Sequence, residues 1–447
     1  MSRSAARPRV SQSSFVWRNW TGDQTCSPAA FERPVTTEEI SAAVTRAADR
    51  DWTVRVAGSG HSFTDAVTTD GLLLSLERMN RVLDLDPEAG LVRVQAGITL
   101  NALNRALAGE GVALPNLGDV DVQSVAGATA TGTHGTGSRL PNLSAGIHAM
   151  RLVLADGSVT EINEDDDPEE LRAARVSIGC LGVVAEVELK VGEAFVLEGK
   201  DERRPLDDVL DRIDELVDSN DHFEFLSFPH SRLVHARTNN RVDAPARPRS
   251  RGGAWANDVL LTNHLFGAAC RLGRRVPAWI PAINRTVTRL GGKSSRIDRS
   301  DRIFTTPRRV RFTEMEYAIP RATGAEAVRA VHRLVEERGF TVPFPMEVRF
   351  VASDDAFLSP AHGRDTCYVA VHMFERMEWE PYFRAVEEIM DDFGGRPHWG
   401  KRHFQTAETL RPRYPEWDRF AAVRARLDPA GRFTNDYVRR VLGPLPQ

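Results

Sequence analysis

The sequence predicts an α+β fold in which helices and short strands alternate along the chain. The chain has 447 residues, of which 41% are hydrophobic and 27% are charged, an ordinary composition for a globular protein. At about 150 residues per domain, this length predicts two or three domains. Apolar stripes with helical spacing recur between stretches that alternate like strands, and we find no internal repeat. Such a chain can bury a sizeable core together with a large ligand.

The charge balance and the cysteines exclude several classes of protein. Lysine and arginine number 58 against 62 acidic residues, and the formal net charge of -4 gives no general attraction to nucleic acid. Residues 1–10 lack the apolar core of a secretory signal, and His264 and three arginines interrupt the apolar stretch 259–283. We therefore expect a cytoplasmic protein without a membrane-spanning segment. The cysteines are far apart and form no CxxC pair, which indicates neither a disulfide framework nor a zinc site: Cys26, Cys180, Cys270 and Cys367.

Local signals place several elements in the first half of the chain. Residues 1–28 are expected to be a short tail. Thr36 and Glu39 form a capping box that predicts a helix start, and alternation over residues 52–56 predicts a strand. The other expected elements are a hairpin over 82–94, a helix over 100–107, a hairpin over 150–162 and a strand over 182–191.

The second half alternates differently and predicts a separate α+β domain. We interpret it as an antiparallel sheet covered by helices on one face. After residue 397 we expect a loop and a helix over 417–427. The other expected elements are helices over 206–217, 328–339 and 383–389, strands over 223–228, 311–319, 346–351 and 367–373, and an exposed loop over 241–256.

A glycine-rich turn follows the strand at 52–56. In the run GSGHS, residues 58–62, the two glycines let the backbone turn sharply and expose N–H groups that suit a pyrophosphate. The run is not the GxGxxG fingerprint of a nicotinamide site, because position 63 is Phe and no helix pattern follows. Taken alone, a glycine turn after a strand is more often only a turn.

Small residues dominate a second segment, 118–137. Its sequence, GDVDVQSVAGATATGTHGTG, has almost no large side chains. Threonine hydroxyls and glycine N–H groups suit a backbone that lies against a flat, polyphosphorylated ligand. A tightly packed loop between strands would have the same composition, and the residues alone do not separate these two interpretations.

Charged groups near the C-terminus are candidates for chemistry. On a strand over 346–351, the period of two places Glu347 and Arg349 on one face and their apolar neighbours on the other. A carboxylate and a guanidinium directed into a cavity can orient hydroxyls and stabilise an anion. By itself, however, the pattern fits a solvent-facing ion pair better. Lys401 lies in the loop RPHWGK, where a solvated lysine is the plainer interpretation.

Taken in this order, these stretches resemble the aldonolactone oxidases, such as the L-gulonolactone and D-arabinonolactone oxidases, of the vanillyl-alcohol-oxidase-type FAD family. The resemblance runs from about Asn19 to Leu442. It implies a two-subdomain FAD-binding domain over 29–193, a substrate or cap domain over 194–395, and a segment over 396–447 that completes the active site and returns to the FAD domain. The segments that carry it are RVAGSGHSFTDAVTTDG, GDVDVQSVAGATATGTHGTG, RVSIGCLGVVAEVEL, EVRFVASDDAFLSP, GRDTCYVAVH, FGGRPHWGKRH and RLDPAGRF.

The resemblance also implies which residues hold FAD. His61 matches the histidine that bonds the flavin 8-methyl group in members with covalent FAD, and its presence favours an 8α-histidyl bond over a polar turn residue or a non-covalent contact. His134 is interpreted as positioning the backbone rather than as a second attachment point. No metal is expected, and His398 and His403 are interpreted as cap-loop residues. The implied cofactor-binding residues are Gly58, Ser59, Gly60, His61, Ser62, Gly118, Ser124, Gly127, Thr131, Gly132, Thr133, His134, Gly135 and Val183.

For the reaction, the resemblance implies oxidation of a sugar 1,4-lactone of the L-gulono, D-arabinono or L-galactono type. Hydride passes from a ring hydroxyl carbon to flavin N5. Glu347 and Lys401 are the candidates to bind and deprotonate the hydroxyl, and which of them is the base stays open. Arg349 would stabilise negative charge. Gly118 leaves room beside the flavin, which favours O2 as the acceptor and release of hydrogen peroxide.

Several other functions remain as alternatives. The enzyme could be a dehydrogenase that passes electrons to cytochrome c or a quinone-like acceptor, or an alditol oxidase that acts on open-chain polyols. From a different class, it could be a flavin-binding protein without catalysis, although the retention of four chemical groups argues against this. The short basic clusters 271–275 and 307–311 contain few aromatic residues and fit solvated surfaces better than nucleic-acid binding. They could equally contact an anionic membrane surface peripherally.

Overall fold

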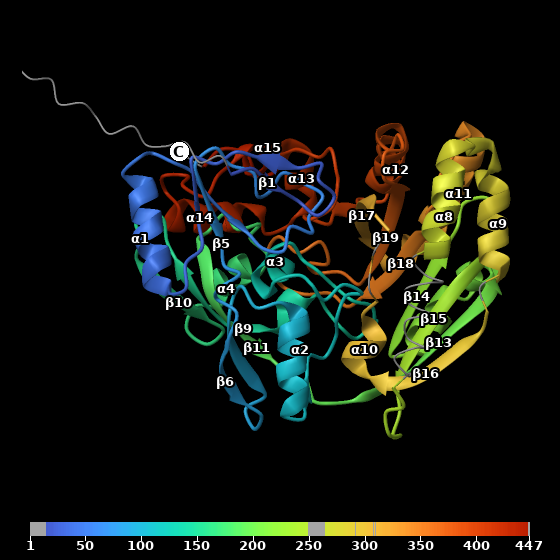
Figure 1. Ribbon diagram of the computed structural model, residues 1–447, viewed down its shortest axis with the longest axis horizontal. Helices are drawn as coiled ribbons and strands as arrows, with labels where there is room; N and C mark the ends of the chain where they lie inside the picture. Colours follow the sequence, from blue (N-terminus) through green and yellow to red (C-terminus); the bar gives the residue numbers. More distant parts are fainter. Residues whose placement is uncertain (1–14, 249–263, 291, 307, 309, 446–447) are drawn as a thin grey trace, which may run out of the picture.

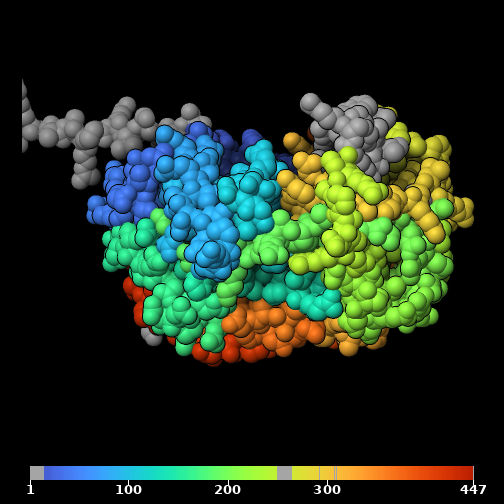
Figure 2. Space-filling view, turned by 90° about the horizontal axis from the view of Figure 1, so that it is seen from below, coloured from blue at the N-terminus to red at the C-terminus, as the bar shows by residue number. Residues whose placement is uncertain are grey.

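The computed structural model describes residues 15–248, 264–290, 292–306, 308 and 310–445. Parts of the expected tail, of the expected loop at 241–256 and of the basic cluster 307–311 lie outside the described residues. Figure 1 shows two lobes side by side, with the N-terminal elements and the red C-terminal helices in one lobe and a large sheet in the other. Figure 2, seen from below, shows the blue and cyan segments on one side and the yellow-green and yellow segments on the other.

The N-terminal lobe contains a parallel and an antiparallel sheet. The parallel sheet has the order β3-β5-β4 and consists of β3 (Ala30–Glu32), β4 (Val54–Ala57) and β5 (Leu72–Ser75). The antiparallel sheet has the order β10-β9-β11-β7-β6 and consists of β6 (Val82–Asp86), β7 (Leu91–Gln95), β9 (Ile147–Val153), β10 (Val159–Asn163) and β11 (Val183–Lys190). A short pair joins β8 (Val112–Ala113) to β12 (Gly192–Glu193). The helices are α1 (Thr37–Ala48), α2 (Leu100–Gly109), α3 (Val125–Ala130) and α4 (Pro168–Arg175), with the short η1 (Leu143–Gly146).

Local sequence signals determine the helix start and the hairpins of this lobe. The Thr36 hydroxyl accepts a hydrogen bond from the backbone N–H of Glu39 at 3.2 Å, so α1 begins at the predicted cap. The hairpin of β6 and β7 turns at Gly90 with φ +68°, and that of β9 and β10 at Gly157 with φ +85°. Glycine adopts this left-handed backbone without strain. The predicted helix start and both predicted hairpins are confirmed.

Residues 15–28 belong to the folded lobe, although the sequence suggests a tail. Strand β1 (Trp17–Arg18) pairs with β2 (Thr25–Cys26) in a short antiparallel hairpin. The hairpin loop closes on Asn19, whose side-chain oxygen accepts hydrogen bonds from the backbone N–H groups of residues 22, 23 and 24. Its amide also donates to the Ser62 carbonyl at 3.1 Å. One buried asparagine thus joins this segment to the glycine-rich turn, and such a long-range contact has no periodic signature in the sequence.

The cap lobe is built on an eight-stranded antiparallel sheet with the order β16-β13-β15-β14-β18-β19-β17-β20. Helices cover one face of this sheet, as predicted. The sequence did not predict β13, β15 or β16. The strands are β13 (Val196–Pro205), β14 (His222–Ser227), β15 (Leu233–Arg241), β16 (Ser294–Arg299), β17 (Phe312–Pro320), β18 (Met346–Val351), β19 (Thr366–Phe374) and β20 (Arg396–Pro397). The covering helices are α5 (Leu206–Asp211), α6 (Ile213–Asp218), α11 (Gly324–Arg338) and α12 (Glu380–Asp392).

The two faces of the cap sheet differ in polarity because side chains alternate along each strand. Met346, Val348 and Phe350 of β18 pack among the apolar residues beneath the helices. The opposite face carries charged and polar side chains, and it faces a cavity between the lobes. These side chains are Glu224, His235, Arg237, Glu314, Glu316, Glu347, Arg349 and His372.

The remaining helices complete the two lobes. Helices α8 (Phe266–Arg275) and α9 (Ile280–Leu290) form a hairpin through the short η3 (Pro277–Trp279) and lie at the far end of the cap in Figure 1. Helix α10 (Ser300–Phe304) follows β16. Helices α13 (Ala407–Leu410), α14 (Trp417–Leu427) and α15 (Asp436–Leu442) return to the core of the N-terminal lobe. Among the described residues, no helix is long and apolar enough to cross a bilayer.

Candidate active site

Two cavities meet between the lobes. The first has a volume of about 460 Å³ and lies within the N-terminal lobe, and the second has a volume of about 970 Å³ and lies between that lobe and the cap sheet. Both are lined by His61, Ser62, Gln123 and Thr131, so these residues mark the junction. A ligand that extends through both cavities would pass His61.

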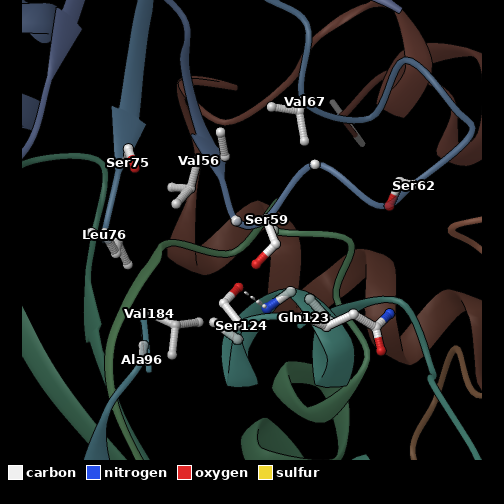
Figure 3. Close-up of a pocket in the computed structure, with 18 of the residues that line it drawn as sticks. Val56, Ser59, Ser62, Val67, Ser75, Leu76, Ala96, Gln123, Ser124 and Val184 are labelled. Carbon is white, nitrogen blue, oxygen red and sulfur yellow. Dashed lines mark hydrogen bonds between the residues drawn. The ribbon is translucent and has the colours of Figure 1, made fainter. Parts of the chain in front are cut away.

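The first cavity lies between the turn after β4 and the start of α3. An alanine side chain at Gly58 would come within 2.4 Å of Ser124 Oγ, so it would displace the Ser124 hydroxyl from its present position. Ser124 caps α3 by accepting a hydrogen bond from Gly127 N, drawn as a dashed line in Figure 3, where Ser59 points towards the same region. Backbone and small side chains therefore form most of this wall, which suits the close approach of a dinucleotide. Of the implied cofactor residues, this cavity is lined by Gly58, Ser59, Gly60, His61, Ser62, Ser124, Gly127 and Thr131.

Three implied cofactor residues line neither cavity. An alanine side chain at Gly135 would come within 2.4 Å of both Asn116 Oδ1 and the Leu117 carbonyl, so this glycine is required by packing inside the loop. Gly132 has φ +76° and lies against Pro360. Val183 is fully buried, whereas its neighbour Val184 lines the first cavity, because successive residues of β11 point to opposite faces.

Gly118, Thr133 and His134 line the second cavity. An alanine side chain at Gly118 would lie 3.1 Å from the His134 carbonyl oxygen and 3.6 Å from the Thr133 methyl group. The first of these distances is shorter than an ordinary van der Waals contact. The wall at Gly118 is therefore tight, and any side chain there would push the backbone around His134.

His61 is held as a neutral imidazole at the junction of the cavities. Its ring stacks on Trp20, with centroids 5.4 Å apart and an interplanar angle of 20°. Burial lowers the pKa of His61, and the nearby positive charge of Lys401 lowers it further. The imidazole therefore keeps a nitrogen lone pair at neutral pH, as a nucleophile requires.

Glu347 and Arg349 share the cavity face of β18, as their spacing predicts. They are only 8% and 7% exposed, so the solvent-facing ion pair is excluded. Arg349 Nη2 donates to Glu347 Oε1 at 2.8 Å, and Arg349 Nε donates to Glu224 Oε2 at 2.9 Å. Asp119 Oδ1 lies 3.7 Å from Arg349 Nη2. Burial raises the pKa of Glu347, with Asp119 and Glu224 adding to the increase against the opposing charge of Arg349.

Lys401 also lines this cavity and is not a solvated lysine. Its ammonium group donates to Glu314 Oε2, and Glu314 Oε1 lies 3.5 Å from His372 Nε2. Burial works against a charged lysine, but Glu314 and Glu316 outweigh burial and raise the pKa of Lys401. Lys401 is therefore a cation throughout the neutral range and has no lone pair with which to accept a proton.

Several charged residues of this cavity were not predicted from the sequence. Glu314 and Glu316 alternate with the apolar residues of β17, as Glu347 and Arg349 do on β18, and this period of two was the available signal. Arg308 is a loop residue that donates to Asp119 at 2.9 Å, and no pattern in the sequence indicates it. The cavity residues missed in this way are Asp119, Arg237, Arg308, Glu314, Glu316 and His372. Glu224, which was also missed, lies opposite Arg349 on the same sheet face.

A buried cluster of His134, Glu316 and His398 has donor atoms within 4.8 Å of one another, although the sequence suggests no grouped ligand set. His134 Nε2 lies 3.2 Å from Glu316 Oε1, and His134 Nδ1 lies 2.9 Å from the Gly135 carbonyl. His398 Nδ1 accepts a hydrogen bond from Gly400 N, so its proton lies on Nε2 and leaves no lone pair there for a metal. Burial lowers the pKa of His398 to about 3, which keeps this ring neutral. The cluster is thus arranged for hydrogen bonding.

The chain is similar to known proteins both in sequence and in fold. Residues 187–441 match the family described as D-arabinono-1,4-lactone oxidase, and residues 28–163 match the family described as FAD binding domain. The fold resembles that of a solvent-stable cholesterol oxidase, with a TM-score of 0.80 at 17% identity over 96% of this chain and 97% of that one. This likeness confirms the predicted α+β fold class.

Relatives match over nearly the whole chain. The chain is 52% identical to an L-gulono-1,4-lactone dehydrogenase of Mycobacterium tuberculosis, covering 96% of this chain and 99% of the relative. It is 34% identical to the L-gulonolactone oxidase of Bos taurus and 34% identical to an alditol oxidase of a Streptomyces species, each covering 95% of this chain and 98% of the relative. The chain therefore belongs to the D-arabinono-1,4-lactone oxidase family and is an FAD-dependent oxidoreductase.

Proposed function

We propose that the protein oxidises a sugar 1,4-lactone at a ring hydroxyl carbon, with FAD lying across the two cavities. The observation that carries this proposal is the convergence of Glu347, Arg349 and Lys401 on one buried cavity that continues into the glycine-lined one. The names of the lactone-oxidising relatives support the substrate class. The test is a panel of L-gulono-, L-galactono- and D-arabinono-1,4-lactones and polyols, assayed first with O2 and then with an artificial acceptor.

The protonation states of the cavity residues indicate a different role for each of them. FAD, when bound, supplies the hydride acceptor at N5. We assign Glu347 as the base, because its pKa is raised while only one of its oxygens is engaged by another described residue, Arg349. Lys401, held as a cation by Glu314, binds and orients the substrate oxygen. Arg349 provides the positive charge that stabilises developing negative charge.

The pH dependence tests this assignment. A base must be deprotonated, so turnover should be lost as the pH falls through the pKa of Glu347. Since burial raises that pKa above the usual 4.5, the loss should begin at a higher pH than for an ordinary glutamate. Glu347→Gln should remove this loss of turnover at low pH, and it should slow flavin reduction roughly a hundredfold. The exposed Glu380→Gln is the matched control. If the turnover of Glu347→Gln falls at the same low pH as that of the wild type, another residue is the base.

We further propose that His61 bonds the flavin 8-methyl carbon. Three features support this bond: the position of His61 where the two cavities meet, its neutral imidazole, and the stacking of its ring on Trp20. An electron-withdrawing 8α-histidyl group raises the flavin reduction potential, which eases hydride removal from an unactivated carbon.

We propose O2 as the electron acceptor, with hydrogen peroxide as the product. The relatives carry the names of both dehydrogenases and oxidases, so they leave the acceptor open. Gly118 supports an oxidase, because its position on the cavity wall adds no side chain where O2 would approach. The alternative is a dehydrogenase that uses a protein or quinone-like acceptor.

Gly118→Ala tests the acceptor. Its methyl group would lie 3.1 Å from the His134 carbonyl oxygen and would narrow the cavity at this point. We therefore expect reoxidation by O2 to slow roughly tenfold, while reoxidation by an artificial acceptor changes little. Stopped-flow mixing of the reduced enzyme with O2 measures this step directly. Gly109→Ala, where nothing lies within 4 Å of the added methyl group, is the control. Equal O2 reactivity in the two variants would show that Gly118 does not control the approach of O2.

A further inference from the structure

The hairpin of α8 and α9, here called the mouth hairpin (residues 264–290), exposes an unusual amount of apolar surface. Leu290 is 79% exposed and Trp279 is 55% exposed, and Leu265 and Leu272 are exposed as well. Among the described residues, these four make up half of the eight large apolar side chains that are exposed. A concentration of this kind on one element marks an interaction surface.

Four large apolar residues of the mouth hairpin, Leu265, Leu272, Trp279 and Leu290, are exposed, whereas Ile280 is buried. In α9 the buried positions include the polar Asn284 and Thr288, and Asn284 Nδ2 donates to the carbonyls of Pro229 and Val342 at 3.0 and 2.9 Å. Ile283 and Leu290 lie instead on the side that lines the second cavity. The buried side of α9 is therefore partly polar, and part of its apolar surface faces the cavity and solvent.

Both helices place their apolar rows at the rim of the same cavity. In and just before α8, the spacing of four and three residues puts Leu265, Ala269 and Leu272 on one helical face. Trp279, Ile283 and Leu290 follow the same helical periodicity through η3 and α9. Since these residues line the cavity and several of them are exposed, they form an apolar part of its rim.

The mouth hairpin is also strongly basic. Between residues 264 and 293 there are six basic residues and no acidic one, in a chain whose formal net charge is -4. Arg271, Arg275, Arg285 and Arg289 are exposed, and within the described part of the chain no carboxylate forms an ion pair with them. Apolar side chains flanked by arginines are the pattern of a helix that lies in the interface of an anionic bilayer.

We propose that the mouth hairpin docks the protein onto an anionic phospholipid membrane, with the active-site cavity opening towards the lipid. Trp279 and Leu290 insert at the level of the lipid headgroups, and the four exposed arginines contact lipid phosphates. The charge complementarity favours a lipid surface over a second copy of this chain, because two such hairpins would bring eight arginines together. Binding of this kind is peripheral and reversible, and it requires no membrane-spanning helix.

Vesicle flotation with the FAD-loaded, full-length protein tests the proposal. Vesicles of phosphatidylcholine with about 30% phosphatidylglycerol are compared with vesicles of pure phosphatidylcholine. This fraction of anionic lipid gives a strong negative surface charge. We expect at least about tenfold more protein on the anionic vesicles, and loss of this excess in high salt. No binding to the anionic vesicles, or equal binding to both kinds, would overturn the proposal.

Variants locate the contact. Trp279→Ser with Leu290→Ser should reduce binding to anionic vesicles about tenfold or more, and Arg285→Gln with Arg289→Gln should do the same. The control is Leu83→Ser with Val159→Ser, which removes exposed apolar side chains from the N-terminal lobe and should bind like the wild type. Wild-type binding by both mouth-hairpin variants would contradict the proposal. So would a stable dimer in the absence of vesicles that Trp279→Ser with Leu290→Ser dissociates, because the apolar rows would then cover each other.

Discussion

Arg349→Ala should slow reduction of the bound flavin by lactone roughly a hundredfold or more, the usual scale for a group that stabilises charge in the transition state. Arg349 donates to Glu347 and Glu224 and lies near Asp119. Its removal leaves Glu347, Glu224 and the half-buried Asp119 without this counter-charge, so the pKa of Glu347 should rise further and less of the base would be available.

Anaerobic stopped-flow bleaching of the flavin absorbance measures this effect on the reductive step alone. Breaking a buried ion pair can cost about 3–5 kcal/mol of stability, so the variant must first be shown to be folded and to retain FAD. Arg349→Lys provides a second variant, which keeps the charge but cannot make both side-chain contacts, and it should show an intermediate rate. Arg384→Ala, from an exposed ion pair with Glu380, is the control. A reduction rate in Arg349→Ala within a few-fold of the wild type would contradict the proposed role.

His61→Ala should abolish the flavin that stays with the denatured chain. In the wild type, acid precipitation should leave a yellow pellet, because the 8α-histidyl bond survives unfolding. In His61→Ala the flavin should appear entirely in the supernatant, and any lactone oxidation that remains should be slower because the reduction potential is lower.

His148→Ala is the matched control for this experiment, since His148 is a partly buried histidine whose Nδ1 lies 3.3 Å from a Glu164 carboxylate oxygen, away from both cavities. It should keep the yellow pellet. If His61→Ala also keeps it, another residue holds the cofactor, and His134 is the first to examine because it lines the second cavity. A wild-type pellet without colour would show that FAD is bound non-covalently and would leave the proposed lactone oxidation standing.

The parts of the fold that could be predicted are those determined by local sequence. The cap of α1, the glycine turns at 90 and 157, and the limits of β18 follow from a few neighbouring residues. Strand β13 could not be predicted in this way. Its sequence, VLEGKDERRP, is mostly charged and shows no alternation, and it becomes a strand because β15 and β16 pair with it on both sides. Tertiary pairing outweighs the local preference here.

The candidate site was predictable only in part, for the same reason. The period of two placed Glu347 and Arg349 on one face, but it gave no information about which strands lie beside β18. The neighbours β14 and β19 bring Glu224 and His372 to the same face, and this depends on strand register. The pairing of Lys401 with Glu314 is equally non-local, and it changes the expected role of the lysine from a candidate base to a fixed cation.

The most direct test of the central claim is anaerobic mixing of the purified enzyme with L-gulono-1,4-lactone while the flavin absorbance is followed. We predict complete bleaching in the wild type and bleaching roughly a hundredfold slower in Glu347→Gln with an unchanged flavin content. Two results would contradict the assignment of this cavity as the site of lactone oxidation. One is a flavin that no lactone or polyol bleaches, and the other is flavin reduction at the wild-type rate in both Glu347→Gln and Arg349→Ala.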